Sequence, residues 1–146
     1  KTFGIQLDIN NHGQIKSVVE QIITQSGRID VLVNNAGYGL FGAIEELSME
    51  EARMQMETNF FSVLAMTQAV LPGLRKQKSG HILQISSMSG LRANSGTGLY
   101  NASKLSLEGM SEALALEIQP LNIHLTPFAF SMQLPLTHFI NEYGLI

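Results

Sequence analysis

Short apolar runs alternate with helical segments along most of this chain, and this alternation restricts the fold more than any other feature. The apolar runs have the length of strands and lie at residues 3–8, 29–33, 81–85 and 123–128. The segments between them have the spacing of amphipathic helices and lie at about 11–26, 48–71 and 99–118. Strands that alternate with helices pair in parallel, because each helix carries the chain back along the sheet. We therefore expect an α/β fold with a parallel sheet between helices.

Local signals place the ends of the predicted helices. Ser48 and Glu51 have the spacing of a capping box, which predicts a helix start. Gly27 is a typical residue just beyond a helix end. Pro72 is expected to weaken or end the second helix, because proline lacks the amide proton that a helix interior requires.

Composition narrows the class of protein. The chain has 146 residues, 45% hydrophobic and 14% charged, and this balance suits one domain with a buried core. A net charge of −3 provides no electrostatic attraction for nucleic acid. No apolar run reaches the roughly 18 residues that a membrane span requires. The absence of cysteine excludes disulfides and thiolate metal sites, and because it fits a reducing compartment we expect a cytoplasmic protein.

Tyr100 and Lys104 lie at the start of the third predicted helix and suggest a site of proton transfer. Residues four apart on a helix share one face, so the phenol and the ammonium are expected to be neighbours. A positive charge beside a phenol favours the phenolate form, and proton transfer near neutral pH needs such tuning. The pair alone has little weight, because this spacing occurs by chance in many helices.

Three further motifs precede this pair along the chain. They are a turn after the second apolar run (Asn34-Asn35-Ala36-Gly37), an asparagine in the second helix (Asn59) and a serine after the next strand (Ser87). These motifs and Tyr-x-x-x-Lys, in this order and spacing, are the marks of the short-chain dehydrogenase/reductase family. From about Leu7 to Thr126, the chain therefore resembles this family.

The resemblance implies a Rossmann-like, doubly wound parallel sheet. It also implies an enzyme that transfers hydride between NAD or NADP and a carbonyl or secondary alcohol. In such an enzyme Tyr100 would be the general acid in reduction and the base in oxidation. Lys104 would assist it and hold the nicotinamide ribose, Ser87 would hydrogen-bond the substrate oxygen, and Asn59 would hold a water for proton relay. Two neighbouring serines compete with Ser87, and only the spacing to Tyr100 selects it.

The resemblance also assigns residues to cofactor binding. Besides Tyr100 and Lys104, these are Asp8, Asn35, Ala36, Gly37 and Pro127. Small residues at the carboxyl end of a parallel strand allow a ligand to approach closely, although a tight turn explains them almost as well. Asp8 would contact the adenine, or it caps a helix. The family has Pro-Gly where this chain has Pro127 followed by phenylalanine, a bulkier residue at the turn that meets the nicotinamide.

Two strands of the family's fold are not expected within this sequence. The dinucleotide fold has strand order 3-2-1-4-5-6, and its glycine-rich phosphate turn follows strand 1. If residues 3–8 are strand 3, no earlier segment supplies strands 1 and 2, so we expect 1–146 to be a single partial Rossmann-like domain. Glycines at positions 37, 39 and 42 fit G-x-G-x-x-G, but no helix opens directly after them. We interpret them as a loop beside a cleft.

Substrate and partners are predicted in outline. The loop at 88–98 and the segment 130–146 are expected to shape the substrate site, the latter as a lid, with a short helix near 136–142, over a fairly apolar carbonyl or alcohol. The helices at 48–71 and 99–118 are apolar over wide arcs, which favours a homodimer or homotetramer, as in the family, or burial within one chain. The alternative to an enzyme is a catalytically silent family member that serves as a binding or regulatory scaffold.

Overall fold

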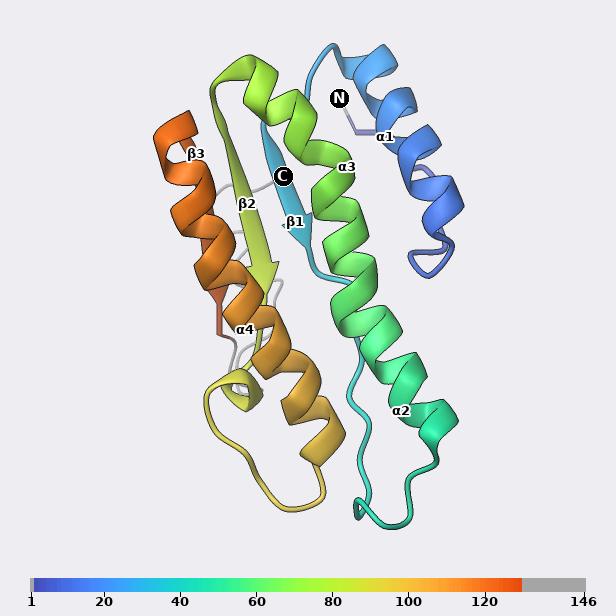
Figure 1. Cartoon of the computed structure of the whole chain (residues 1–146). Helices are drawn as coiled ribbons and strands as arrows, with labels where there is room; N and C mark the ends of the chain where they lie inside the picture. The colour runs from blue at the N-terminus through green and yellow to red at the C-terminus, as the bar shows by residue number, and fades with distance from the viewer. Residues whose placement is uncertain (1, 130–146) are drawn as a thin grey trace.

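Three parallel strands form the sheet of this protein (Figure 1). The computed structural model describes residues 2–129. Its strands are β1 (Val31–Asn34), β2 (Gly80–Ile85) and β3 (Ile123–Phe128), paired in the order β1-β2-β3. Both pairs are parallel, and Asn34, Gln84 and Pro127 lie side by side in the register. This arrangement confirms the predicted α/β class and its Rossmann-like parallel sheet.

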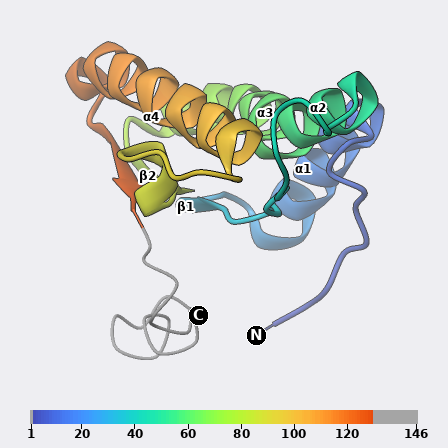
Figure 2. The same ribbon diagram turned by 90° about the horizontal axis from the view of Figure 1, so that it is seen from below.

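Helices connect the strands and return the chain to the same end of the sheet. The α-helices are α1 (His12–Ser26), α2 (Met49–Met56), α3 (Ser62–Gln77) and α4 (Gly98–Ile118), and the short helices are η1 (Glu57–Phe61), η2 (Met88–Gly90) and η3 (Gln119–Leu121). The π-helical turn η1 joins α2 to α3 in one continuous rod. Figures 1 and 2 show α3 and α4 side by side over one face of the sheet, and α1 packs against α3.

The hydrophobic core lies where α1, α3 and the end of α4 meet the sheet. Its buried members are Ile15, Val19, Val70, Leu74, Ile82, Ile118 and Ile123. The predicted start of the second helix is confirmed, because the Ser48 hydroxyl accepts from the Glu51 amide and the Glu51 carboxylate accepts from the Ser48 amide. Gly27 follows the last residue of α1 with a φ of 82°, a conformation that favours glycine.

The predicted end of the second helix at Pro72 is wrong. Helix α3 continues through this proline to Gln77. A proline inside a helix costs about 3 kcal/mol relative to alanine. Val70 and Leu74 flank it and are only 3% and 0% exposed, and full burial of each such side chain contributes about 1.5–3 kcal/mol. Packing against the sheet therefore offsets the missing hydrogen bond, and the helix ends where Lys78 adopts a φ of 54°.

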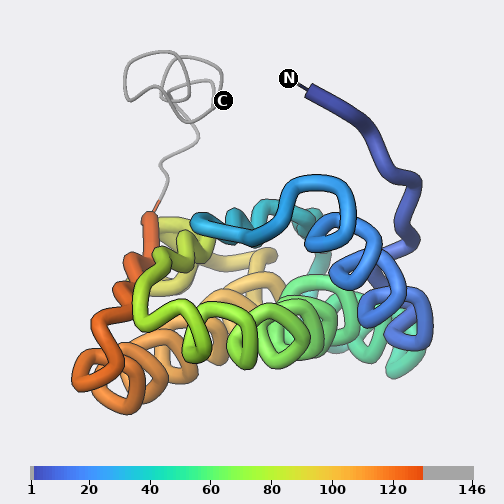
Figure 3. The backbone as a smooth tube through the Cα atoms, turned by 90° about the horizontal axis from the view of Figure 1, so that it is seen from above, coloured from blue at the N-terminus to red at the C-terminus, as the bar shows by residue number. Residues whose placement is uncertain are grey.

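The predicted strand at 3–8 is not formed. A strand requires hydrogen bonds to a neighbouring strand, and no described segment pairs with these residues. Figure 3 shows this N-terminal segment running out from the body as an extended chain. Its side chains Ile5 and Leu7 line an apolar groove beside β1, together with Ile22 of α1. The alternating apolar side chains of residues 3–8 therefore line this groove beside α1 and β1, although the segment does not form a strand.

A buried polar network joins the sheet to α3. The Asn34 side chain donates to Gln84 Oε1 at 2.9 Å and to Thr67 Oγ1 at 3.0 Å. Asn34 is 7% exposed and Gln84 0%. Because buried polar groups are costly without partners, this network fixes the carboxyl end of β1 relative to β2. The first asparagine of the Asn-Asn-Ala-Gly turn is therefore a structural residue.

Pro127 lies in β3, which has a described neighbour only on its β2 side. Proline is tolerated on such an edge strand because its missing amide need not pair there. Among residues 2–129, no helix combines the length and apolarity needed to cross a membrane. The predicted lid at 130–146, with its candidate helix near 136–142, falls outside the described residues.

Candidate active site

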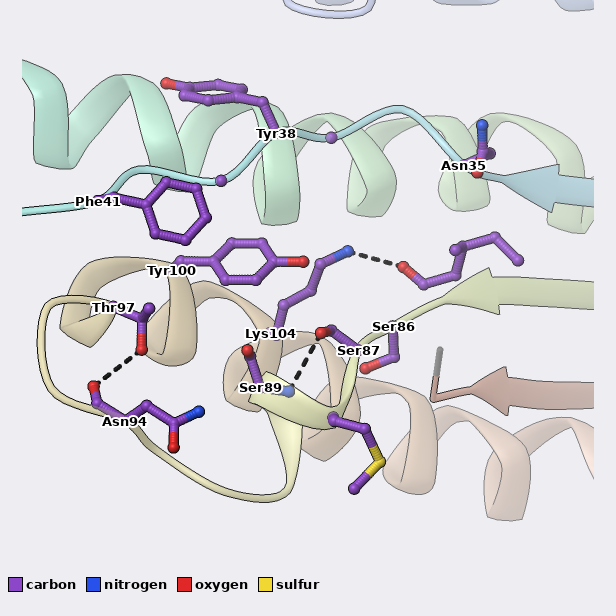
Figure 4. A pocket seen from close by; sticks show the side chains of 14 residues that line it. Asn35, Tyr38, Phe41, Ser86, Ser87, Ser89, Asn94, Thr97, Tyr100 and Lys104 are labelled. Carbon is purple, nitrogen blue, oxygen red and sulfur yellow. Dashed lines mark hydrogen bonds between the residues drawn. The ribbon is translucent and has the colours of Figure 1, made fainter. Parts of the chain in front are cut away.

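A cavity of about 520 Å³ opens at the carboxyl ends of β1 and β2 (Figure 4). Its walls are the chain that follows β1, the loop that follows β2 and the first turns of α4. The side chains around it include Asn35, Tyr38, Phe41, Ser87, Met88, Asn94, Thr97, Tyr100 and Lys104. Open parallel sheets bind ligands at this edge, because loops and helix starts gather there around a rigid sheet.

Tyr100 and Lys104 reach this cavity from adjacent turns of α4, as the four-residue spacing predicts. The Lys104 ammonium lies 5.9 Å from the centre of the Tyr100 ring. In Figure 4 the hydroxyl of Tyr100 points into the cavity toward Lys104 and Ser87. The structure therefore brings together the phenol, the ammonium and the hydroxyl that the sequence motifs identify.

Lys104 is a buried cation, only 6% exposed. Its Nζ donates to the Ile85 carbonyl at 2.7 Å, and its other two N–H bonds have no hydrogen-bond partner among the described residues. Burial lowers the pKa of Lys104 from 10.5 to about 8, because the charged form loses its hydration, while the carboxylate of Glu108 raises the pKa in part. The ammonium is thus held at the end of β2 with two donors available to a ligand.

The two serines that compete with Ser87 are Ser86 and Ser89, and exposure distinguishes Ser87 from Ser86 but not from Ser89, which is also half-buried at the cavity. Ser87 Oγ accepts from the amide of Ser89 at 3.1 Å, which leaves the hydroxyl proton of Ser87 free to donate into the cavity. The Ser86 side chain is 3% exposed, and its Oγ has no partner in the described chain. An added methyl on Gly90 would meet Ser86 Oγ at 2.9 Å, so η2 covers this hydroxyl.

Asn59 lies in η1 and is fully buried beside the cavity. Its Oδ1 accepts from the Tyr38 amide at 3.1 Å, and its Nδ2 donates to the Tyr38 carbonyl at 2.9 Å and to Ser103 Oγ at 3.0 Å. The Asn59 side chain therefore fastens the chain after β1 to the helix that carries Tyr100. Single π-helical turns are frequent at functional sites, and here the turn places an amide between two walls of the cavity.

The residues of the turn Asn35-Ala36-Gly37 are all exposed, and Asn35 and Gly37 line the cavity. A Cβ at Gly37 would lie 3.1 Å from Asn59 Oδ1 and 3.8 Å from Lys104 Nζ, so only glycine fits without moving the Asn59 amide. Exposed small residues and the two available donors of Lys104 meet at one edge. This donor set fits the hydroxyl groups of a ribose, which can accept from an ammonium.

Three predicted cofactor residues, Asp8, Ala36 and Pro127, are not among those that line the cavity, although Ala36 adjoins Asn35 and Gly37, which do line it. Asp8 is exposed and forms a turn before α1, where its carboxylate accepts from the amide of Asn10 at 3.0 Å. Pro127 lies within β3, opposite Gln84. The contact of Asp8 belongs to the turn before α1 and is not a helix cap, because α1 begins at His12 and its N-cap residue is Asn11.

Sequence reasoning missed several residues of the cavity wall. Phe41 places its ring 6.4 Å from the Tyr100 ring, centre to centre, although it is 64% exposed. Tyr38 supplies the backbone groups that Asn59 binds. The sequence signal that could have identified Phe41 as a cavity residue is its position as an apolar residue in a glycine-rich loop after a strand. The interpretation of that loop as one side of a cleft agrees with the geometry, as does the expectation that 88–98 borders the substrate site.

Comparison with models of known protein families shows the family to which this chain belongs. The family model described as short chain dehydrogenase matches residues 1–132. The chain belongs to the short-chain dehydrogenase family. This confirms the resemblance inferred from the four motifs.

Two relatives of this chain are named as a reductase and a dehydrogenase. The chain is 50% identical over 117 residues to 3-ketodihydrosphingosine reductase of Bacteroides thetaiotaomicron, covering 80% of this chain and 44% of that protein. It is 40% identical over 121 residues to human retinol dehydrogenase 8, covering 83% of this chain and 38% of that protein. The chain therefore spans less than half the length of these relatives.

Solved structures share the fold. A short-chain dehydrogenase from Streptomyces avermitilis superposes with a TM-score of 0.83 at 38% identity, covering 86% of this chain and 46% of that one. The structure of gox2181 superposes with a TM-score of 0.85 at 29% identity, covering 94% of this chain and 56% of that one. The short-chain dehydrogenase fold is thus supported by both sequence and structure.

Proposed function

We propose that this protein is an NAD(P)-dependent oxidoreductase that transfers hydride between a nicotinamide cofactor and a carbonyl or secondary alcohol. The observation that carries the proposal is the convergence of Tyr100, Lys104 and Ser87 on one cavity at the carboxyl edge of the sheet. Membership of the short-chain dehydrogenase family supports the same reaction class.

Each side chain has a role that follows from its contacts. Tyr100 donates a proton to the carbonyl oxygen in reduction and accepts one in oxidation, because its hydroxyl points into the cavity. Lys104 places its ammonium 5.9 Å from the centre of this phenol ring, within the same cavity. Ser87 donates its free hydroxyl proton to the substrate oxygen and stabilises the charge that develops there.

The cofactor supplies the hydride, and the chain supplies its position. Lys104 would donate to the ribose hydroxyls through its two available N–H bonds. Asn35, Ala36 and Gly37 would leave room for close approach of the cofactor, since all three residues are exposed. Asn59 would hold the wall between Tyr38 and Ser103 and a water for proton relay. Asp8 and Pro127 remain predicted contacts of the adenine and nicotinamide ends.

The substrate is proposed to be a fairly apolar carbonyl or alcohol compound. Phe41 and Met88 line the cavity and are 64% and 48% exposed, so apolar surface is available at its mouth. The relatives named for 3-ketodihydrosphingosine and retinol act on apolar molecules, in agreement with this chemistry. We also infer a cytoplasmic protein, because the absence of cysteine fits a reducing compartment. We further infer a homodimer or homotetramer, since α2 and α4 carry exposed apolar side chains.

Substituting Tyr100→Phe tests the proposed reaction. The change removes one hydroxyl and keeps the ring against Phe41, so the fold and cofactor affinity should stay close to wild type. Because positioned acid–base groups contribute about 10²–10⁴-fold to rate, turnover should fall by that factor. The measurement is oxidation of NADPH or NADH with a ketone substrate, together with fluorescence titration of the cofactor.

The scaffold alternative gives a different result in the same experiment. A catalytically silent family member would show no turnover in wild type, and Tyr100→Phe would change neither cofactor affinity nor partner binding. Equal turnover in wild type and Tyr100→Phe would contradict the role of the phenol. The protein would then be an enzyme that uses another proton donor.

A further inference from the structure

The loop of residues 88–97 forms one wall of the cavity, and most of its residues are exposed to solvent. Its regular structure is limited to the short helix η2, and its backbone hydrogen bonds are short-range turns, apart from the Gly42 amide, which donates to the Gly96 carbonyl at 2.9 Å. Exposed loops of this kind open and close readily unless their backbone is tied to a rigid element. What fixes this loop therefore affects the shape of the site.

Asn101, the residue after Tyr100, ties the loop to α4. Its side chain is 2% exposed. Its Nδ2 donates to the Ser89 carbonyl at 2.8 Å and to the Arg92 carbonyl at 2.9 Å. Its Oδ1 accepts from the Thr97 hydroxyl at 2.5 Å. One buried amide therefore binds the beginning, the middle and the end of the loop.

The chemistry of these contacts requires an amide of this length. Two carbonyl oxygens need two N–H donors, and the Asn101 amide provides both. Its Oδ1 is also an acceptor for the Thr97 hydroxyl, which has the Asn94 carbonyl as a second acceptor at 2.8 Å. Aspartate provides no donor at neutral pH, and alanine provides neither donor nor acceptor. Because Asn101 sits on the same helical turn as Tyr100, the loop is fixed relative to the proposed acid–base group.

We propose that Asn101 is a positioning residue that sets which carbonyl substrates bind, by holding the loop 88–97 in one shape against Tyr100. This inference rests on the proposed function. The reacting oxygen meets Tyr100 and Ser87, whereas the loop faces the rest of the substrate. Loss of the clamp is therefore expected to weaken substrate binding more than the chemical step.

The test compares Asn101→Asp with the matched change Asn122→Asp in the full-length protein. Asn122 also donates from Nδ2 to a distant backbone carbonyl, that of Lys78 at 3.1 Å, but it lies at the start of β3 outside the cavity wall. Aspartate tolerates the left-handed backbone at Asn122, where φ is 56°. Asn101→Ala is the second variant, because a buried carboxylate could prevent folding.

The kinetic probes are 2-decanone and 2-butanone with NADPH and NADH. In the Asn101 variants, KM for 2-decanone should rise about tenfold, the effect of one or two lost hydrogen bonds, while kcat changes by less than about threefold. The preference for the longer ketone should fall, and Asn122→Asp should behave as wild type. An unchanged KM, or a fall in kcat alone, overturns the proposal.

Hydrogen exchange tests the clamp without turnover. The amides of Gly90, Leu91, Arg92 and Thr97 donate within the loop, and their exchange should become about tenfold faster in the Asn101 variants. Unchanged exchange overturns the clamp. A wild type that reduces neither ketone counts against the proposed function, whereas unchanged exchange counts against Asn101, so the two failures are distinguishable.

Discussion

Burying the Lys104 ammonium costs folding free energy, and the protein retains it at the centre of the candidate site. Its pKa is about 8 in the folded state and 10.5 for the ordinary group. Between these pH values the unfolded chain binds more protons than the folded chain, so the contribution of Lys104 to the free energy of unfolding increases as the pH rises from 8 to 10.5. Below pH 8 its full desolvation cost is present.

The lowered pKa predicts the alkaline side of the activity profile. If Tyr100 needs the charged form of Lys104, kcat/KM should fall as the pH rises through about 8. Glu108→Gln should move this fall to lower pH, because the Glu108 carboxylate raises the pKa of Lys104. The matched control is Glu112→Gln, an exposed glutamate one turn further along α4. A profile that is the same in Glu108→Gln and wild type would show that Lys104 does not govern it.

The two adjacent serines should differ in function. Ser87→Ala removes the free hydroxyl proton at the cavity and is expected to lower kcat by about 10²-fold, as for the loss of one donor to a developing oxyanion. Ser86→Ala removes a hydroxyl that η2 covers, so its effect should be much smaller. The measurement is steady-state ketone reduction. Equal losses in both variants would contradict the assignment of Ser87.

At the scale of elements, α3 shows how packing overrides a local signal. The helix crosses Pro72 because residues on either side of it are buried against the sheet. Removing the local conflict should therefore stabilise the protein.

Pro72→Ala should raise the free energy of unfolding by about 1–3 kcal/mol, since alanine restores the amide that the helix interior lacks. Gly73→Ala is the matched change at the next position, where an added Cβ meets no atom within 4 Å. It should contribute about 0.5–1 kcal/mol through lower entropy of the unfolded chain. Urea unfolding measures both. If Pro72→Ala instead destabilises the protein, the packing of the proline ring stabilises the fold by more than the missing helix hydrogen bond costs.

The π-helical turn η1 is the second element with a specific consequence. Asn59→Ala should cost about 1–3 kcal/mol, because the Tyr38 backbone and Ser103 would lose a buried partner. Thermal unfolding gives the stability change. A variant as stable as wild type would mean that water replaces the Asn59 amide.

At the scale of the whole molecule, exposed apolar side chains gather on helices that face away from the core. Met54 and Phe61 on the α2–η1 rod are 48% and 44% exposed, and Leu105 and Leu116 on α4 are 52% and 70% exposed. Exposed apolar side chains on neighbouring helices favour burial against another chain. The proposed homodimer or homotetramer would use these two helices.

The double variant Phe61→Asp/Leu105→Asp should therefore be a monomer, because charges are costly in an apolar interface. Ile23→Asp on α1, 37% exposed, is the control that adds a similar charge elsewhere. Sedimentation velocity measures the oligomeric state. If the double variant and wild type sediment alike, these faces do not form the interface.

Much of the fold could be predicted because its signals are local. The alternation of strands and helices, the capping box at Ser48 and the shared face of Tyr100 and Lys104 depend on residues a few positions apart. The short-chain dehydrogenase motifs also have fixed positions along the chain. The sequence by itself therefore determined the fold class and the family, and it predicted that Tyr100, Lys104 and Ser87 lie together, as they do at the cavity.

Tertiary structure decided what depends on distant segments. Residues 3–8 have a strand pattern but no paired neighbour, α3 continues past Pro72 because the sheet buries its far end, and Lys104 loses part of its proton affinity through burial. The clamp of Asn101 on the loop 88–97 likewise joins groups that no spacing rule connects. Hydrogen-bond partners and desolvation arise only when the chain has folded, and this is the physical reason that local patterns do not contain them.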